Sequence, residues 1–272
     1  MSGWGAPRSE NMTMNIRRNR IKDKLAAGEV ATIVGGVGLN THLVDFLGPL
    51  GFDGVWLEAE HGTVTWDQMD DLARASDLWG MSSVLRVYSA EPWVITRALD
   101  RGVNSIVIPH VNSREQAQGI VQSAKFGPIG LRGIYPSRRA FGVPDYFERA
   151  NDETMVIVLI EDIRAIENLA EIITVDHIDA FFVAAGDLSQ SMGYVMQMDH
   201  PEVVAVVDRA IRQITAAGRV AGTLALNDAM LARNHQSGAR LFLTVYDGWL
   251  RSGAQGFLTS LADRVPRGPS RG

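Results

Sequence analysis

The chain has 272 residues, of which 46% are hydrophobic and 27 are glycines, a composition that suits a packed α/β core rather than a disordered chain. A formal net charge of -5 argues against nonspecific nucleic-acid binding, because that affinity comes mainly from Lys and Arg replacing counterions on phosphates. The absence of cysteine excludes disulfides, thiolate nucleophiles and thiolate-bound zinc, so a metal would need oxygen or imidazole ligands. Small-molecule chemistry is therefore favoured.

The N-terminal segment MSGWGAPRSENMTMN is mixed and polar, with neither a secretory apolar core nor a membrane span. We expect a soluble, cytoplasmic protein with no membrane and no nucleic-acid partner. Basic residues then gather between positions 17 and 24. A solvated first helix is the favoured interpretation of this cluster, and a nucleic-acid or targeting patch is the alternative.

Short β-branched runs recur along the chain and predict eight strands. They cover residues 31–38, 54–60, 82–88, 104–110, 155–162, 179–187, 220–226 and 240–248. Segments with helical periodicity lie between most of them, at 67–80, 113–127, 165–173 and 201–218. Glycines at positions 80, 102, 127 and 218 fall where helices are expected to end.

Near-continuous apolar strands that alternate with helices indicate parallel strands covered on the outside, and eight such units are the number that closes a barrel. We predict a single (β/α)8 TIM barrel over residues 14–262, with an N-terminal extension at 1–13 and a C-terminal tail at 263–272. An open doubly wound sheet is the alternative, although no GxGxxG motif or Walker-type lysine supports a nucleotide-binding version. The long Gly/Pro/Arg-rich loop at 127–153 is either a structural excursion or a lid over the active face.

Ionisable residues stand at the ends of several predicted strands. They are Glu58, Glu60 and His61 after the second strand, Arg86 in the third, Glu161 and Asp162 after the fifth, and Asp187 after the sixth. In a barrel of this type the carboxyl ends of the strands open on one face, so residues far apart in the sequence converge there. We therefore expect these side chains to surround a common pocket.

The inventory of side chains restricts the chemistry of that pocket. The chain has three lysines, Lys22, Lys24 and Lys125, and none lies where a Schiff-base lysine at the barrel centre is needed. An enzyme that activates a carbonyl must then use an arginine, a histidine or a metal ion. Glu161 and Asp187 are a candidate pair of oxygen ligands for an octahedral Mg2+ or Mn2+.

The sequence resembles the HpcH/HpaI aldolase family, the metal-dependent (class II) pyruvate aldolases. The matching stretches are GFDGVWLEAEHG (51–62), VLRV (84–87), ALDRGVNSIVIPHVNSREQA (98–117), GPIGLRG (127–133), PDYFERANDE (144–153), VLIED (158–162) and DAFFVAAGDLSQSMGY (179–194). The resemblance implies a (β/α)8 barrel, assembled as a homohexamer built from a trimer of dimers, in which the last helix is exchanged between barrels. It also implies a divalent metal, Mg2+, Mn2+ or Co2+, which binds pyruvate or its enolate while the bond to an aldehyde is made or broken.

Roles follow from the resemblance at the matching positions. Glu161 and Asp187 would be the metal ligands, Arg86 would face the pyruvate keto oxygen, and His61 would be the acid/base residue. Glu60, beside His61 in the motif, would hold metal-bound water.

The resemblance also implies roles for Asp100 and for the turn at Gly186 and Asp187, and the sequence departs from it at position 58. Asp100 matches an acidic position that reaches a neighbouring subunit's site, and backbone N–H groups near Gly186 and Asp187 would hold the pyruvate carboxylate. Position 58 is Glu where many relatives carry Asp, which lengthens the arm that orients His61 by one methylene.

The expected reaction is reversible cleavage of a 4-hydroxy-2-oxo acid to pyruvate, or a related 2-oxo acid, and an aldehyde. A 2-oxo-acid decarboxylase or another carbon–carbon lyase on the same enolate is one alternative, and a non-catalytic oligomeric binding protein is another.

Each candidate residue also has a structural alternative. Glu161 could pair with Arg132 or Arg164, Asp187 could cap the following helix, His61 could be a core histidine, Arg86 could be an interior ion-pair partner, and Asp100 could end a helix without a catalytic role. The loop arginines Arg132, Arg138 and Arg139 are interpreted as solvated, with binding of an anionic aldehyde as the alternative.

Overall fold

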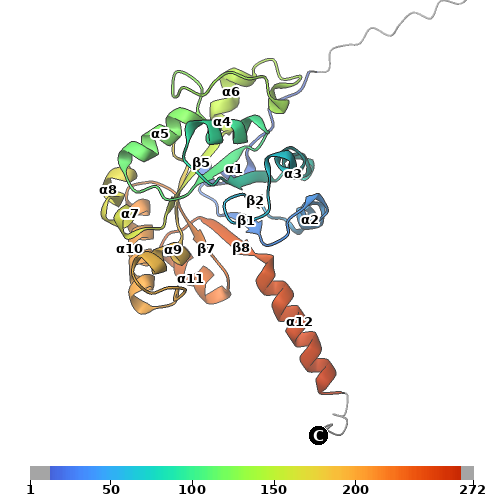
Figure 1. Cartoon of the computed structure of the whole chain (residues 1–272), viewed down its shortest axis with the longest axis vertical. Helices are drawn as coiled ribbons and strands as arrows, with labels where there is room; N and C mark the ends of the chain where they lie inside the picture. Colours follow the sequence, from blue (N-terminus) through green and yellow to red (C-terminus); the bar gives the residue numbers. More distant parts are fainter. Residues whose placement is uncertain (1–12, 265–272) are drawn as a thin grey trace, which may run out of the picture.

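Eight parallel strands pair in the order of the sequence and close into a barrel (Figure 1). They are β1 (Ala31–Gly35), β2 (Gly54–Glu58), β3 (Ser82–Arg86), β4 (Ser105–Ile108), β5 (Met155–Ile160), β6 (Ala180–Val183), β7 (Ala221–Leu224) and β8 (Leu241–Val245). Closure is made by β8 against β1, in a register that runs from Ala31 opposite Leu241 to Gly35 opposite Val245. The predicted α/β class and the eight strands are confirmed, and the closed barrel is consistent with the TIM type.

This computed structural model describes residues 13–264. The predicted N-terminal extension, except Thr13, and the predicted C-terminal tail beyond Arg264 lie outside the described residues. No helix between residues 13 and 264 is both long enough and apolar enough to cross a membrane.

Helices connect the strands and cover most of the barrel wall. They are α1 (Arg20–Ala26), α2 (Thr41–Leu47), α3 (Trp66–Leu78), α4 (Pro92–Asp100), α5 (Arg114–Ala124), α6 (Tyr146–Glu153), α7 (Ile163–Glu167), α8 (Leu169–Ile172), α9 (Ala185–Ser191), α10 (Pro201–Ala216), α11 (Asp228–Gln236) and α12 (Tyr246–Ala262). The helix predicted at 165–173 is in fact two short helices that meet at Asn168. Gly80, Gly102 and Gly218 adopt positive φ just after α3, α4 and α10, as expected of glycines that end helices.

Both faces of the strands are buried, which explains their nearly continuous apolar sequence. In β5, Ile157 and Leu159 belong to the cluster that fills the barrel, whereas Val156 and Val158 pack outward against the helices. Side chains alternate between the two faces with a period of two. A residue two positions beyond the last inward side chain of a strand is therefore directed toward the barrel axis, and this alternation positions the candidate site.

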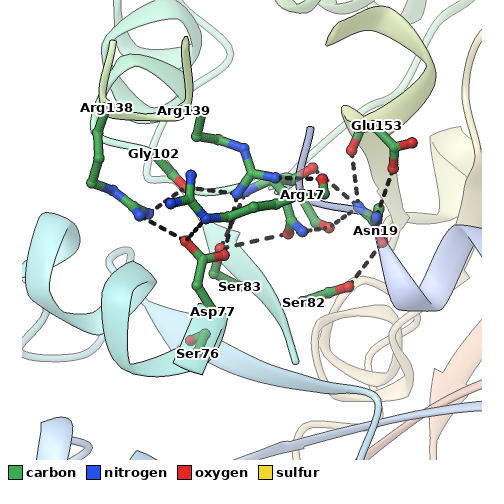
Figure 2. Close-up of polar contacts among 12 residues, drawn as sticks. Arg17, Asn19, Ser76, Asp77, Ser82, Ser83, Gly102, Arg138, Arg139 and Glu153 are labelled. Carbon is green, nitrogen blue, oxygen red and sulfur yellow. Dashed lines mark hydrogen bonds and ion pairs between the residues drawn. The ribbon is translucent and has the colours of Figure 1, made fainter. Parts of the chain in front are cut away.

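The opposite, N-terminal end of the barrel is closed by a buried polar network (Figure 2). Asn19 donates hydrogen bonds from its side chain to Ser105 Oγ at 2.9 Å and to the carbonyl of Asn104 at 3.2 Å, and its backbone N–H donates to the Glu153 carboxylate at 2.6 Å. All of these partners stand just before a strand or at its first residue. The segment that precedes α1 therefore forms the floor of the barrel.

The loop at 127–153 also packs at this floor. Arg138 donates to Asp77 at 2.7 Å, and Arg139 contacts the same carboxylate at 3.3 Å (Figure 2). Arg132 and Arg139 are buried, so the interpretation of these two arginines as solvated was wrong. These contacts support the interpretation of the loop as a structural excursion at the N-terminal end of the barrel, and not as a lid over the face where the strands' carboxyl ends open.

The last helix, α12, projects away from the barrel (Figure 1). Tyr246 is its one buried residue, while Leu250, Phe257 and Leu258 are each more than 60% exposed. Consequently the part of the chain that the structure describes leaves a row of large apolar side chains on this helix uncovered.

Candidate active site

A cavity of about 490 Å3 opens at the carboxyl ends of the strands. Six of the predicted site residues line it, namely Glu58, His61, Arg86, Glu161, Gly186 and Asp187. Glu58, Arg86 and Glu161 each stand two positions after an inward side chain of the barrel cluster, respectively Trp56, Val84 and Leu159. The alternation of the strands thus carries them into a common pocket, as predicted.

Glu58 binds both Arg86 and the turn that carries His61. One carboxylate oxygen accepts hydrogen bonds from Arg86 Nε at 2.7 Å and from Trp56 Nε1 at 2.9 Å. The other accepts from the backbone N–H groups of Glu60 at 2.8 Å and His61 at 3.0 Å. Burial raises the pKa of Glu58, but the bond from Trp56 and the charge of Arg86 outweigh this effect and leave the pKa lowered. The side chain is therefore a carboxylate that holds both the arginine and the turn carrying the histidine.

Arg86 is held by two acids. Besides its bond to Glu58, its Nη1 lies 3.1 Å from the Glu60 carboxylate, and its guanidinium carbon lies 5.8 Å from the centre of the Trp56 ring. These contacts fix the plane of the guanidinium and employ Nε and Nη1. Arg86 also lines the cavity, and its contacts with Glu58 and Glu60 are made by Nε and Nη1 and not by Nη2.

His61 lies on the turn after β2 with its side chain 66% exposed, so the core-histidine alternative was wrong. Its Nε2 is 3.9 Å from Glu60, and its backbone is tied to Glu58. Gly62 permits this turn, because a Cβ at that position would lie 2.6 Å from the Glu58 carbonyl oxygen. The imidazole is consequently presented at the mouth of the cavity and is not packed in the core.

Glu161 is almost completely buried, and its two oxygens have different surroundings. Oε1 accepts a hydrogen bond from the His110 backbone N–H at 2.7 Å, whereas Oε2 is buried with no hydrogen-bond partner among the described residues. Burial raises the pKa of Glu161, and the nearby charges of Asp187 and Glu60 raise it further, against the lowering effect of His110. An unpartnered carboxylate oxygen beside other acids is the environment that a bound cation would relieve.

The structural alternatives for Glu161 and Asp187 were both wrong. Arg132 pairs with Asp100 and Arg164 with Asp162, so neither arginine reaches Glu161. Because α9 begins at Ala185 and has Ala184 as its N-cap, Asp187 lies within the first turn instead of capping it.

These two acids fit the oxygen ligand set of a hard divalent cation that takes its other ligands from water and substrate. No group of three or more His, Cys, Asp or Glu side chains arranged for a metal occurs among residues 13–264.

His110, to which the sequence analysis assigned no role, lies beside two of the site acids. It follows β4, adopts a positive φ of 55°, and places Nδ1 3.3 Å from Glu161 and Nε2 3.6 Å from Glu60. The signal that could have found it is its position at the end of a strand, as for the other site residues. The imidazole thus lies close to both acids, and Glu60 is also the acid that Arg86 Nη1 contacts.

Asp100 lies apart from these residues. It ends α4, where Arg132 donates to it at 2.7 Å, and it does not line the cavity of its own chain. The role predicted for it at a neighbouring subunit's site therefore stays a prediction.

Residues 37–245 match the family model described as HpcH/HpaI aldolase/citrate lyase. The chain belongs to this family. The resemblance inferred from the sequence is thereby confirmed, and so is the expected carbon–carbon lyase activity.

Among relatives of this family member, the 4-hydroxy-2-oxo-heptane-1,7-dioate aldolase of Salmonella dublin is 35% identical over 84% of this chain and 88% of the relative. The hydroxypyruvate/pyruvate aldolase of Roseobacter denitrificans is 31% identical over 84% and 91% of the two chains. The crystal structure of an HpcH/HpaI aldolase from Desulfitobacterium hafniense superimposes with a TM-score of 0.84 at 25% identity, covering 90% of this chain and 97% of that one.

Proposed function

We propose that this chain is a divalent-metal-dependent aldolase that reversibly cleaves a 4-hydroxy-2-oxo acid to pyruvate, or a related 2-oxo acid, and an aldehyde. The observation that carries the proposal is that one cavity is lined both by the Arg86 guanidinium, held in a fixed orientation, and by Glu161, whose Oε2 has no hydrogen-bond partner among the described residues. Arg86 is held by Glu58 and Glu60, and Glu161 Oε2 lacks a hydrogen-bond partner among the described residues.

In this proposal Glu161 and Asp187 hold the cation, which would be Mg2+, Mn2+ or Co2+. Their oxygens are the ligand type that such hard ions prefer. Burial raises the pKa of Glu161, with smaller contributions from the charges of Asp187 and Glu60, and a bound cation would offset both effects. When bound, the ion would supply positive charge beside the carboxylate and 2-oxo oxygens of the substrate.

The protein groups then act at defined atoms of the substrate. Arg86 Nη2 would donate a hydrogen bond to the 2-oxo oxygen, which gains negative charge as the C3–C4 bond breaks. His61 would accept the proton of the 4-hydroxyl group, so that C4 leaves as the carbonyl of an aldehyde. Glu58 keeps both groups in register because one carboxylate binds the Arg86 side chain and the His61 backbone.

The substrate carboxylate would lie against the turn into α9. Ala184, Gly186 and Asp187 all line the cavity there, and the first backbone N–H groups of the helix have no helical acceptor. A Cβ at Gly186 would meet no atom within 4 Å, so this position leaves room for a ligand.

Assembly as a homo-oligomer is also part of the proposal, with the hexamer of the resemblance as its specific form. The uncovered apolar side chains of α12 support it, because a chain with Leu250, Phe257 and Leu258 exposed gains by burying them against a second copy. Sedimentation of the Leu250→Glu variant is expected to show smaller particles than the wild type. A cytoplasmic location and the choice of metal rest on the sequence and its resemblance.

The test is a panel in which pyruvate or hydroxypyruvate is offered with a set of aldehydes in the presence of Mg2+, Mn2+ or Co2+. We expect condensation that stops with EDTA and returns with metal. Release of CO2 from oxaloacetate without any condensation would favour the decarboxylase alternative.

A pair of matched variants tests the cation site separately. Glu161→Gln should abolish metal binding by calorimetry, whereas Glu167→Gln, at an exposed position on α7, should retain it. Equal metal affinity in the two variants would show that Glu161 is not a ligand.

A further inference from the structure

We infer that the aldehyde that condenses with the 2-oxo acid is uncharged and carries no carboxylate of its own. This inference rests on the proposed function and specifies the substrate class of the same cavity. It comes from the distribution of charge around the rim.

The order of the strands divides the cavity into two arcs. Arg86 ends β3, Glu161 follows β5 and Asp187 follows β6, so the groups assigned to the 2-oxo acid occupy one side of the ring. The opposite side is formed by β7, β8 and β1. A substrate anchored at the first arc must extend its remaining carbons toward the second.

The position of His61 is consistent with a substrate that extends from the first arc toward the second. It stands on the turn after β2, which pairs with β1 on one side and β3 on the other. The hydroxyl that His61 deprotonates is on C4, the first carbon of the aldehyde fragment. The fragment beyond C4 therefore lies between His61 and the β7–β8–β1 arc.

This second arc is apolar. Its lining side chains include Val37, Leu39, Leu224, Leu243 and Val245. Moving a carboxylate from water onto such a surface is unfavourable unless a cation or a set of hydrogen-bond donors replaces its hydration. An alkyl or hydroxyalkyl chain meets no comparable penalty.

The described lining of this chain offers no free cation to compensate for that penalty. Among the described residues that line the cavity, Arg86 is the sole arginine or lysine, and it is already engaged by Glu58 and Glu60. The charged side chain present on the second arc is Asp247, which accepts a hydrogen bond from the Val37 backbone N–H at 3.2 Å. An aldehyde with a terminal carboxylate would thus meet an acid of the same sign.

The substrate in the name of the Salmonella dublin relative, 4-hydroxy-2-oxo-heptane-1,7-dioate, has a carboxylate at C7. Cleavage between C3 and C4 leaves that carboxylate on the aldehyde. The charge distribution described above disfavours this product for the present chain, despite the 35% identity between the two proteins.

The test compares two acceptors that differ in charge and are closely similar in length, 4-oxobutanoate and its methyl ester, each with pyruvate and the activating metal. We expect kcat/KM for the ester to exceed that for the acid by at least about tenfold, because the carboxylate of 4-oxobutanoate is repelled by Asp247 and the uncharged ester is not. Raising the salt concentration should narrow the ratio, since screening weakens the repulsion. A 4-oxobutanoate value equal to or above that of the ester overturns the inference.

A variant pair isolates the cause. Asp247→Asn retains an acceptor for the Val37 N–H but removes the charge, so it should raise the relative use of 4-oxobutanoate severalfold. Asp176→Asn, on the exposed surface, should leave the ratio unchanged. An unchanged ratio in Asp247→Asn overturns the inference, and an absence of condensation with any aldehyde overturns the proposed function and this inference with it.

Discussion

Replacing Glu58 by Gln removes one charge and one acceptor from the centre of the site. The wild-type carboxylate receives four donors, two on each oxygen. Glutamine has one acceptor oxygen and one NH2 group, so in either orientation two donors face an NH2 group. If the NH2 group turns toward Arg86 and Trp56, the guanidinium loses its anchor. If it turns toward the backbone, the His61 turn loses both of its bonds.

The expected loss follows from these contacts. An unsatisfied buried donor costs about 1–3 kcal/mol, and since the Glu58 side chain keeps 20% of its surface exposed we take the lower end, which gives about 2 kcal/mol of stability for two donors. Turnover should fall more steeply, by roughly 10²-fold, because a misplaced Arg86 no longer meets the developing oxyanion.

The measurements are kcat for retro-aldol cleavage and the free energy of unfolding in denaturant. Glu58→Asp is the control, since it keeps the charge on a shorter arm and should lose less of both quantities. Acid stability gives a second readout. Because the folded pKa of Glu58 is lowered, its contribution is present above the unfolded pKa of 4.5 and is lost as the pH falls below that value. A Gln variant with kcat within about twofold of the wild type would refute the reasoning.

Three other variants probe separate features. Arg86→Lys should lower kcat by about 10²-fold or more with the fold intact by circular dichroism, since an ammonium cannot reproduce the three directions of the guanidinium, and near-normal turnover would contradict this role. His110→Ala should weaken divalent-cation binding by about tenfold in calorimetry, because Glu161 loses its imidazole neighbour; unchanged affinity would make His110 a bystander. Lys125→Met should flatten the rise in stability between pH 8 and 10.5: burial lowers the folded pKa of Lys125 to about 8, below its ordinary 10.5, so the unfolded chain binds more protons in that range and stability increases with pH. If denaturation midpoints of the wild type and this variant run parallel across that range, the assignment fails.

The convergence of the acids was predictable because strand alternation and parallel closure are both encoded in short-range patterns. Glu58, Arg86 and Glu161 continue the inward series of their strands, so the position of each follows from counting residues by two. The barrel itself follows from the repeated alternation of strand and helix. These features need no knowledge of distant contacts.

His110 was missed for the opposite reason. Val107 points into the barrel, so the alternation would turn position 110 outward, and the left-handed backbone at this residue reverses that direction. The 127–153 loop was equally ambiguous, because its position depends on Asp77, an acid 61 residues before Arg138 in the sequence. The strand-end position of His110 is a local signal, but neither its positive φ nor a partner 61 residues away from Arg138 can be seen in a local pattern.

The barrel floor also determines the order in which the chain can mature. Asn19 is synthesised early, yet its acceptor Glu153 comes 134 residues later. During translation, the segment before the first helix can therefore make its native hydrogen bonds only after β4 has formed and the residues preceding β5 have left the ribosome. A nascent chain arrested before that point should leave the N-terminal end of the barrel open, and the fraction of nascent chains bound by chaperones should fall once Glu153 emerges.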